Sequence, residues 1–170
     1  MDVVLIGRRT WALWLMALLV GAVLSLGALT AAHAAQKAAL SVAAEQAIAG
    51  YRAGERAALR TLDAGVLAQT ALFATGAALA DLAGRMQSLR TSGAYTQREI
   101  ESFAVREVIE EDAQLSVLAE EVHSVQTALQ ASGAAVETNR RTAFEVTYTL
   151  VQEAGRWKVR SVAAVETGVR

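Results

Sequence analysis

The side chains best suited to proton transfer lie in one short segment, where His123 follows Glu120 and Glu121. A histidine beside a carboxylate can act as a general acid or base, because small changes in its surroundings move its pKa through neutrality. The local pattern predicts a strand, on which residues two apart share a face, so Glu121 and His123 would point the same way. That face can equally be solvated, and we therefore expect no catalytic residue.

Other motifs that carry chemistry are missing from the sequence. The chain has no cysteine, which excludes a lipoprotein anchor, a disulfide framework, a thiolate metal site and a cysteine nucleophile. It has no phosphate-binding loop, nucleophile elbow, zinc-protease helix or dinucleotide fingerprint. The carboxylates between Glu99 and Glu121 lack the spacing of a calcium loop. We predict no enzyme activity, no cofactor and no metal, and the net charge of −1 gives no reason to expect nucleic acid.

Aromatic side chains gather on the last predicted hairpin, at Phe144, Tyr148 and Trp157. Aromatic residues at alternating positions of a strand usually belong to the core. One that lined a concave sheet face would instead anchor a partner segment, as buried aromatics commonly do at interfaces. The candidate partner-binding residues are therefore Tyr148, Trp157, His123 and Glu121.

The N-terminal part carries an uncharged apolar run, Trp11–Leu29, directly after Arg8 and Arg9. Its length is close to the ~20 residues that a helix needs to cross a bilayer. The arginines before the run place the N-terminus in the cytoplasm by the positive-inside rule. We predict a cytoplasmic N-terminus at residues 1–10, a transmembrane helix or uncleaved signal anchor at residues 11–31, and a periplasmic or extracellular remainder.

A secretory signal peptide is the alternative for this segment, because Ala32, His33 and Ala34 form an A-x-A site that would be cleaved after Ala34. The apolar run is longer than the roughly 7–15 residues usual in a signal peptide, which favours the uncleaved anchor. Small residues at four-residue intervals along the run could pack against another membrane helix: Ala17, Gly21 and Ser25.

Helical periodicity continues through residues 32–62, which form a juxtamembrane or first domain helix. Its apolar residues recur at three- and four-residue spacings and make one stripe. Most of its charged residues fall on the other side: Lys37, Glu45, Arg52, Glu55, Arg56 and Arg60. Whatever packs on the stripe approaches closely, because the stripe is rich in alanine.

Two shorter helices are expected next. Asp63 can cap a helix that extends to about Phe73, and Thr75 can cap another over residues 76–90. Gly93 can end the second helix in a left-handed conformation.

After Gly93 the hydrophobic period changes from 3.6 to 2, which indicates strands. Alternating apolar residues mark four of them, and one slip in the first suggests a bulge: around 103–109, 115–125, 144–150 and 157–165. Helices followed by hairpin-connected strands predict an α+β fold, with helices packed on a curved four-stranded antiparallel sheet. Residues 63–170 would form this remainder of the domain.

The chain from about Glu45 to Val165 resembles the intermembrane-space (IMS) domain of ARC-type plastid-division proteins and of small bacterial membrane-anchored relatives. The residues that carry the resemblance are LADL at 79–82, LRTSGAY at 89–95 and, above all, VTYTLVQEAGRWKV at 146–159. A similar last hairpin occurs across NTF2-like and actinobacterial Mce-associated membrane proteins. The resemblance implies a cone-shaped NTF2-like or cystatin-like α+β domain that binds proteins outside the cytoplasm without catalysis.

Two functional hypotheses follow. The first is a single-pass, membrane-anchored binding or scaffold module of the cell envelope, whose partners are envelope or membrane proteins and the bilayer itself, with a homo-oligomer or a subunit of a membrane complex as further options. The alternative is an NTF2-like domain that binds or converts a small molecule. A deep polar cavity containing His123 and a carboxylate would favour the alternative.

Overall fold

The computed structural model describes the backbone of residues 3–129, 132 and 134–169, and the side chains of residues 30–129, 132, 134 and 141–168. The chain divides into two compact units, Met1–Ser41 and Val42–Arg170. One helix, α1 (Val3–Thr61), runs through both units. The sheet and the other two helices belong to the second unit.

In the first unit the backbone is helical throughout its described part, including the predicted membrane segment at residues 11–31. Across the portion of the chain that the structure describes, no helix combines the length and the apolar character needed to span a bilayer. The transmembrane prediction is thus not confirmed. The proposed packing residues Ala17, Gly21 and Ser25 lie on this helix, but their side chains are outside the described residues.

Two of the three residues that were predicted to cap helices do so in the structure. The Asp63 carboxylate accepts a hydrogen bond from the Gly65 N–H and caps α2 (Ala64–Thr70). Gly93 ends α3 (Gly76–Ser92) with φ 65°, the left-handed conformation that glycine adopts without strain. Thr75 precedes α3, but its side chain does not cap the helix. The Thr75 hydroxyl donates instead to the Glu153 carboxylate at 3.0 Å.

The helix expected to reach Phe73 ends at Thr70, because the backbone that follows pairs with the sheet. Val159 donates its N–H to the Phe73 carbonyl at 2.8 Å, and the Thr75 N–H donates to the Val159 carbonyl at 2.8 Å. These two bonds form a short parallel bridge between Ala74 and Val159. A sheet edge therefore satisfies the backbone groups that a longer helix would have used.

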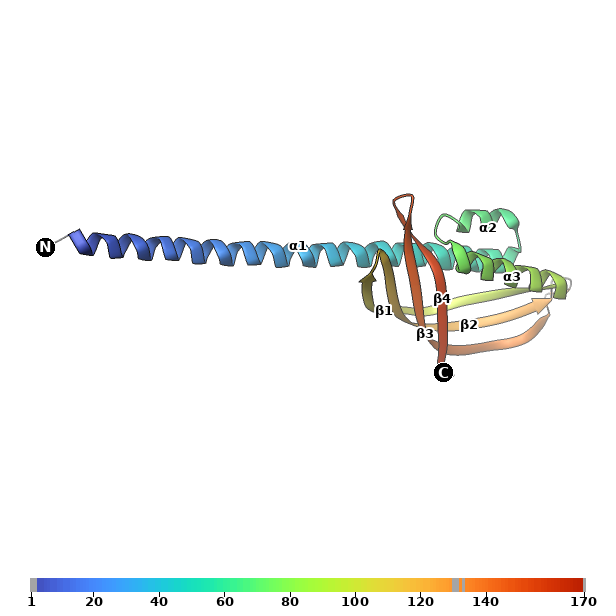
Figure 1. Ribbon diagram of the computed structural model, residues 1–170. Helices are drawn as coiled ribbons and strands as arrows, with labels where there is room; N and C mark the ends of the chain where they lie inside the picture. The colour runs from blue at the N-terminus through green and yellow to red at the C-terminus, as the bar shows by residue number, and fades with distance from the viewer. Residues whose placement is uncertain (1–2, 130–131, 133, 170) are drawn as a thin grey trace. The chain divides into compact units, whose positions relative to one another are not determined.

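Four antiparallel strands form one sheet in the order β1-β2-β3-β4: β1 (Ala94–Glu111), β2 (Gln114–Leu129), β3 (Ala135–Glu153) and β4 (Arg156–Val169). The predicted slip in the first strand corresponds to two register shifts in β1, between Ile100 and Ser102 and between Val105 and Glu107. Figure 1 shows long curved strands with α3 and the C-terminal part of α1 on one side of them. The predicted α+β class with a four-stranded antiparallel sheet is confirmed.

The core lies between the helices and this face of the sheet. Alternate residues from Leu115 to His123 of β2 and from Val146 to Leu150 of β3 are buried in it, which is the period of a half-buried strand. Fully buried side chains come from two helices and the sheet: Ile48 and Leu59 of α1, Leu82 of α3, and Leu115, Val117, Val146, Tyr148, Leu150 and Val159 of the sheet. The alternating and helical patterns in the sequence thus identified the core-facing sides of these elements.

Candidate functional site

A charged network lies inside the domain, between α1 and the sheet, with Arg52 at its centre. The Arg52 Nε donates to the Tyr148 hydroxyl at 2.6 Å, and its two terminal nitrogens donate to Glu55 Oε2 and Glu121 Oε2, each at 2.7 Å. The guanidinium also lies 5.1 Å from the centroid of the Tyr148 ring, within cation–π range. All five donor positions of an arginine point in fixed directions, so this side chain orients its three partners.

Glu55 receives further arginines at its second oxygen. Arg85 of α3 contacts Glu55 Oε1 at 2.5 Å, and Arg98 of β1 contacts the same oxygen at 3.4 Å. Glu55 is 2% exposed and therefore depends on these partners for its charge. Through Glu55, α1 is joined to α3 and to the edge strand β1.

Glu121 and His123 of β2 meet Tyr148 of β3 on the other side of Arg52. His123 Nε2 contacts Glu121 Oε2, and the Tyr148 hydroxyl donates to Glu121 Oε1. The His123 ring packs against Phe144 with centroids 4.9 Å apart. His123 Nδ1 is buried and makes no hydrogen bond within the described residues. The predicted common face of Glu121 and His123 is confirmed, and that face is the core rather than solvent.

The electrostatics of the network keep its central pair ionised. Burial alone would raise the pKa of Glu55, but the positive charges of Arg52, Arg85 and Arg98 outweigh it and lower that pKa to about 2. Burial alone would lower the pKa of Arg52, yet the surrounding negative groups, Glu55 foremost, hold that pKa above its ordinary value. Both groups therefore stay charged across the physiological range.

At Glu121, the second buried carboxylate, burial and the neighbouring groups also act on the pKa in opposite directions. Burial would raise the pKa of Glu121, but the hydrogen bond from His123 and the charge of Arg52 lower it below its usual range. The pKa of Tyr148 is raised, mainly by burial, so that its hydroxyl keeps its proton and serves as a donor to Glu121.

Of the four candidate partner-binding residues, three lie together and one lies apart. Tyr148, Glu121 and His123 are 0%, 1% and 2% exposed, so in this conformation their side chains contact one another and Arg52 rather than a partner. None of the three pockets described below is lined by His123 or Glu121. Trp157 is half-buried, lies on β4 beside the β3–β4 turn and lines a separate pocket.

Sequence reasoning placed Arg52 and Glu55 on the solvent side of the first domain helix, and this was wrong. Both are buried, at 7% and 2% exposure. The spacing held a signal for Glu55, because it lies four residues after Tyr51 and three before Ala58, within the apolar stripe itself. A charged residue inside such a stripe indicates a buried partner.

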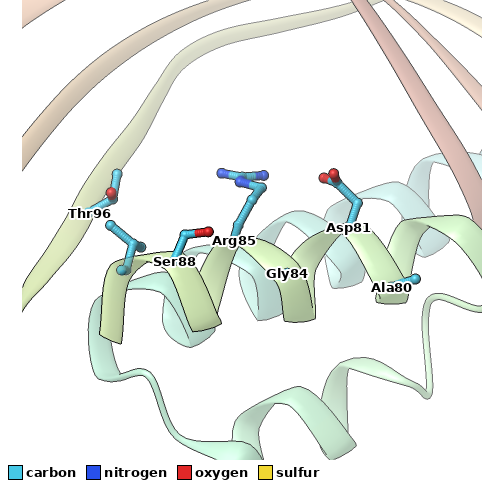
Figure 2. A pocket seen from close by; sticks show the side chains of 7 residues that line it. Ala80, Asp81, Gly84, Arg85, Ser88 and Thr96 are labelled. Atoms are coloured by element: carbon cyan, nitrogen blue, oxygen red, sulfur yellow. The ribbon is translucent and has the colours of Figure 1, made fainter. Parts of the chain in front are cut away.

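Pockets open on the surface of the second unit, and those lined by described residues include the following. The first, about 570 Å³, lies between α3 and β1, and its lining is shown in Figure 2. Asp81, Arg85, Ser88 and Thr96 give this pocket its polar character. Arg85 connects it to the buried network through Glu55. The pocket suits a small ligand or a polar group of a partner, since it offers both a cation and an anion.

The other two pockets differ in character, and the one between α1 and β1 is the more apolar of them. One of about 370 Å³ is bordered by Leu72, Phe73, Arg156 and Trp157. Leu72 and Phe73 are 53% and 39% exposed, which is unusual for large apolar side chains that lie side by side. The last, of about 230 Å³, lies between α1 and β1, where Ile48 and Phe103 contribute to its lining.

Comparisons with known proteins agree with this architecture. The model of the "ARC6-like, IMS domain" family matches residues 64–160. A solved structure, the crystal structure of the intermembrane space region of chloroplast protein ARC6, has a similar fold with a TM-score of 0.61 and 12% sequence identity. That similarity covers 73% of this chain and 95% of the ARC6 chain. No curated protein sequence matches the chain. The chain belongs to the ARC6-like IMS domain family.

Proposed function

We propose that this protein is a membrane-anchored, extracytoplasmic protein-binding module of the cell envelope, and that the pocket at Trp157 is its contact surface. The observation that carries the proposal is the exposed pair Leu72 and Phe73 beside Trp157 and Arg156. Aromatic and arginine side chains are enriched in the energetic centres of protein interfaces. Patches of large apolar side chains on a surface commonly mark interaction sites.

The buried network supports a binding role over catalysis. The groups that could transfer protons, Glu121 and His123, are enclosed and paired with each other and with Arg52. A catalytic acid or base must reach its substrate directly or through one water. These groups instead hold β2 and β3 against α1, which fixes the frame on which the Trp157 pocket is built.

Site-specific photo-crosslinking in intact membranes tests the proposal. A photo-reactive amino acid replaces Leu72 in the full-length chain, and in a matched variant it replaces Ile109, which is 41% exposed on the opposite edge strand β1. We expect one envelope protein to be captured from position 72 and not from position 109. A further Trp157→Ala substitution should reduce this capture strongly. Equal capture from both positions, or none from position 72, would overturn the proposed surface.

A small-molecule function is the second candidate, and the pocket between α3 and β1 favours it. Its volume of about 570 Å³ falls in the roughly 300–1,000 Å³ range of ligand pockets. A ligand that uses this pocket should raise the unfolding temperature of the wild-type protein and lose its effect in Asp81→Ala and Ser88→Ala variants. Absence of any stabilising compound in a metabolite library would leave protein binding as the function.

A further inference from the structure

Positive charge is in surplus where α1, α3 and β1 meet. Three guanidinium groups, those of Arg52, Arg85 and Arg98, contact the single carboxylate of Glu55. Arg52 also pairs with Glu121, but within the described residues Arg85 and Arg98 form no ion pair with a second carboxylate. The Nε of Arg98 is buried there without a hydrogen-bond partner. A surplus of this kind attracts a negative group to the adjoining open surface.

Arg85 carries this surplus into the pocket between α3 and β1. Its Nη1 donates to Glu55 Oε1 at 2.5 Å, and a guanidinium has five N–H donors, so most of them remain for a ligand. The Arg85 side chain is 36% exposed and lines the pocket. Ser88 and Thr96 line it too, and neither hydroxyl forms a hydrogen bond to another residue that the structure describes. Together these three side chains offer several donors to a carboxylate.

Asp81 lies one helical turn before Arg85, a spacing at which two opposite charges commonly pair. In this protein Arg85 bonds to the buried Glu55 instead. Across the described part of the chain, the Asp81 carboxylate forms no ion pair. Figure 2 shows Asp81, Arg85 and Ser88 extending to the same side of α3. The pocket therefore presents a negative group beside a positive one, and the two do not neutralise each other.

We propose that this pocket binds a free amino acid, whose carboxylate lies at Arg85 and whose ammonium group lies at Asp81. The hydroxyls of Ser88 and Thr96 donate to the same carboxylate. A zwitterion satisfies both charged groups of the pocket at once and adds no net charge to the site. The volume of about 570 Å³ leaves room for the side chain of the ligand, which lies against Leu89. The inference rests on the small-molecule function proposed above for this pocket and names its ligand.

Gly84 leaves open space on the face of α3 that lines the pocket. A Cβ at this position would meet nothing within 4 Å, and Gly84 is one of the lining residues. A larger side chain there would enter the pocket without colliding with the rest of the fold. It would also favour the helix, because glycine is a poor helix former. Gly84→Leu therefore fills the proposed site and leaves the protein folded.

Isothermal titration calorimetry of the full-length protein in mild detergent, with each standard free L-amino acid in turn, tests the ligand class. We expect at least one of them to bind, and its deaminated acid and its amide to bind about tenfold more weakly, because each lacks one charge-assisted contact. Asp81→Asn should remove the preference for the amino acid over its deaminated acid, and Arg85→Gln should weaken both. The control Arg106→Gln, at an exposed arginine of β1 outside the pocket, should bind like the wild type.

Gly84→Leu locates the ligand, since it should abolish binding while the unfolding temperature stays equal to or above that of the wild type. Binding that survives in both Gly84→Leu and Arg85→Gln would place the ligand elsewhere and overturn the inference. A response only to compounds that are not amino acids would refute the ligand class and leave the small-molecule function standing. No response to any compound would refute both, whereas the crosslinking at position 72 tests the Trp157 surface independently.

Discussion

At the scale of single residues, Arg52 balances two buried carboxylates at once. Glu55 and Glu121 each accept a hydrogen bond from its guanidinium, and both are almost fully enclosed. A buried ion pair contributes little net stability compared with an apolar pair, but removing one partner leaves a charge without compensation. Removing Arg52 should therefore lower the free energy of unfolding strongly.

Replacing Arg52 by methionine should destabilise the protein by about 3–5 kcal/mol, because two buried carboxylates lose their shared cation. Urea unfolding monitored by circular dichroism measures the change. The control is Arg106→Ala, which removes the exposed ion pair between Arg106 and Glu120 and should change the free energy of unfolding by less than about 1 kcal/mol. Equal effects of the two substitutions would show that Arg52 is not the centre of the network.

Glu55 should make the stability of the protein depend on pH in the acid range. Its pKa is about 2 in the folded protein and about 4.3 in an unfolded chain, so the unfolded state binds more protons between these values. The stabilisation is present above pH ~4.5 and is lost as pH falls through 2, on the order of 3 kcal/mol. The Glu55→Gln variant should be less stable at neutral pH and show a flatter profile between pH 4.5 and 2. Urea unfolding as a function of pH tests both.

At the scale of elements, glycines on two helices have opposite roles. A Cβ at Gly54 of α1 would collide with the Thr70 side chain of α2, whereas a Cβ at Gly84 of α3 would meet nothing within 4 Å. Gly54→Ala should therefore cost about 1–3 kcal/mol through overpacking. Gly84→Ala should add roughly 0.5–1 kcal/mol through helix propensity. Thermal unfolding of both variants measures the signs, and a stabilising Gly54→Ala would contradict the close packing of α1 on α2.

The β3–β4 hairpin turns through Ala154 and Gly155, whose φ angles are 50° and 75°. Two successive left-handed residues form the type I′ turn, for which asparagine followed by glycine is the preferred sequence. Alanine is strained at the first position because its Cβ crowds the backbone. Ala154→Asn should raise the unfolding temperature, by an amount equivalent to about 1 kcal/mol. The Ala154→Val variant, which is β-branched, should lower it.

At the scale of the whole molecule, the proposed location follows from Arg8, Arg9 and the apolar run after them. A C-terminal epitope tag should be removed by protease added to intact cells or spheroplasts, while a tag before residue 1 should be protected until lysis. The size of the mature chain on the same blot distinguishes an uncleaved anchor from cleavage after Ala34. A C-terminal tag that is protected until lysis would reverse the orientation and remove the basis for an envelope partner.

The sequence predicted the elements well where local rules decide them. The alternation of apolar and polar residues identified the strands, and Asp63 and Gly93 marked helix ends. The interruption of this alternation near Val105 predicted the irregular register of the edge strand β1. These features depend on periods and caps that involve residues close together in the chain. The last hairpin also carried the family resemblance that the comparisons confirmed.

The network around Arg52 could not be read in the same way, because its members come from α1, α3, β1, β2 and β3. The sequence by itself determined which face of each element is apolar and therefore the α+β class. Only the tertiary structure decided that Arg52 and Glu55 are buried, since a charge enters a core when partners from distant segments meet it there. The same reason explains why Tyr148 and His123 are buried. The sequence predicted them as contacts with a partner, but the packing of α1 on the sheet encloses them.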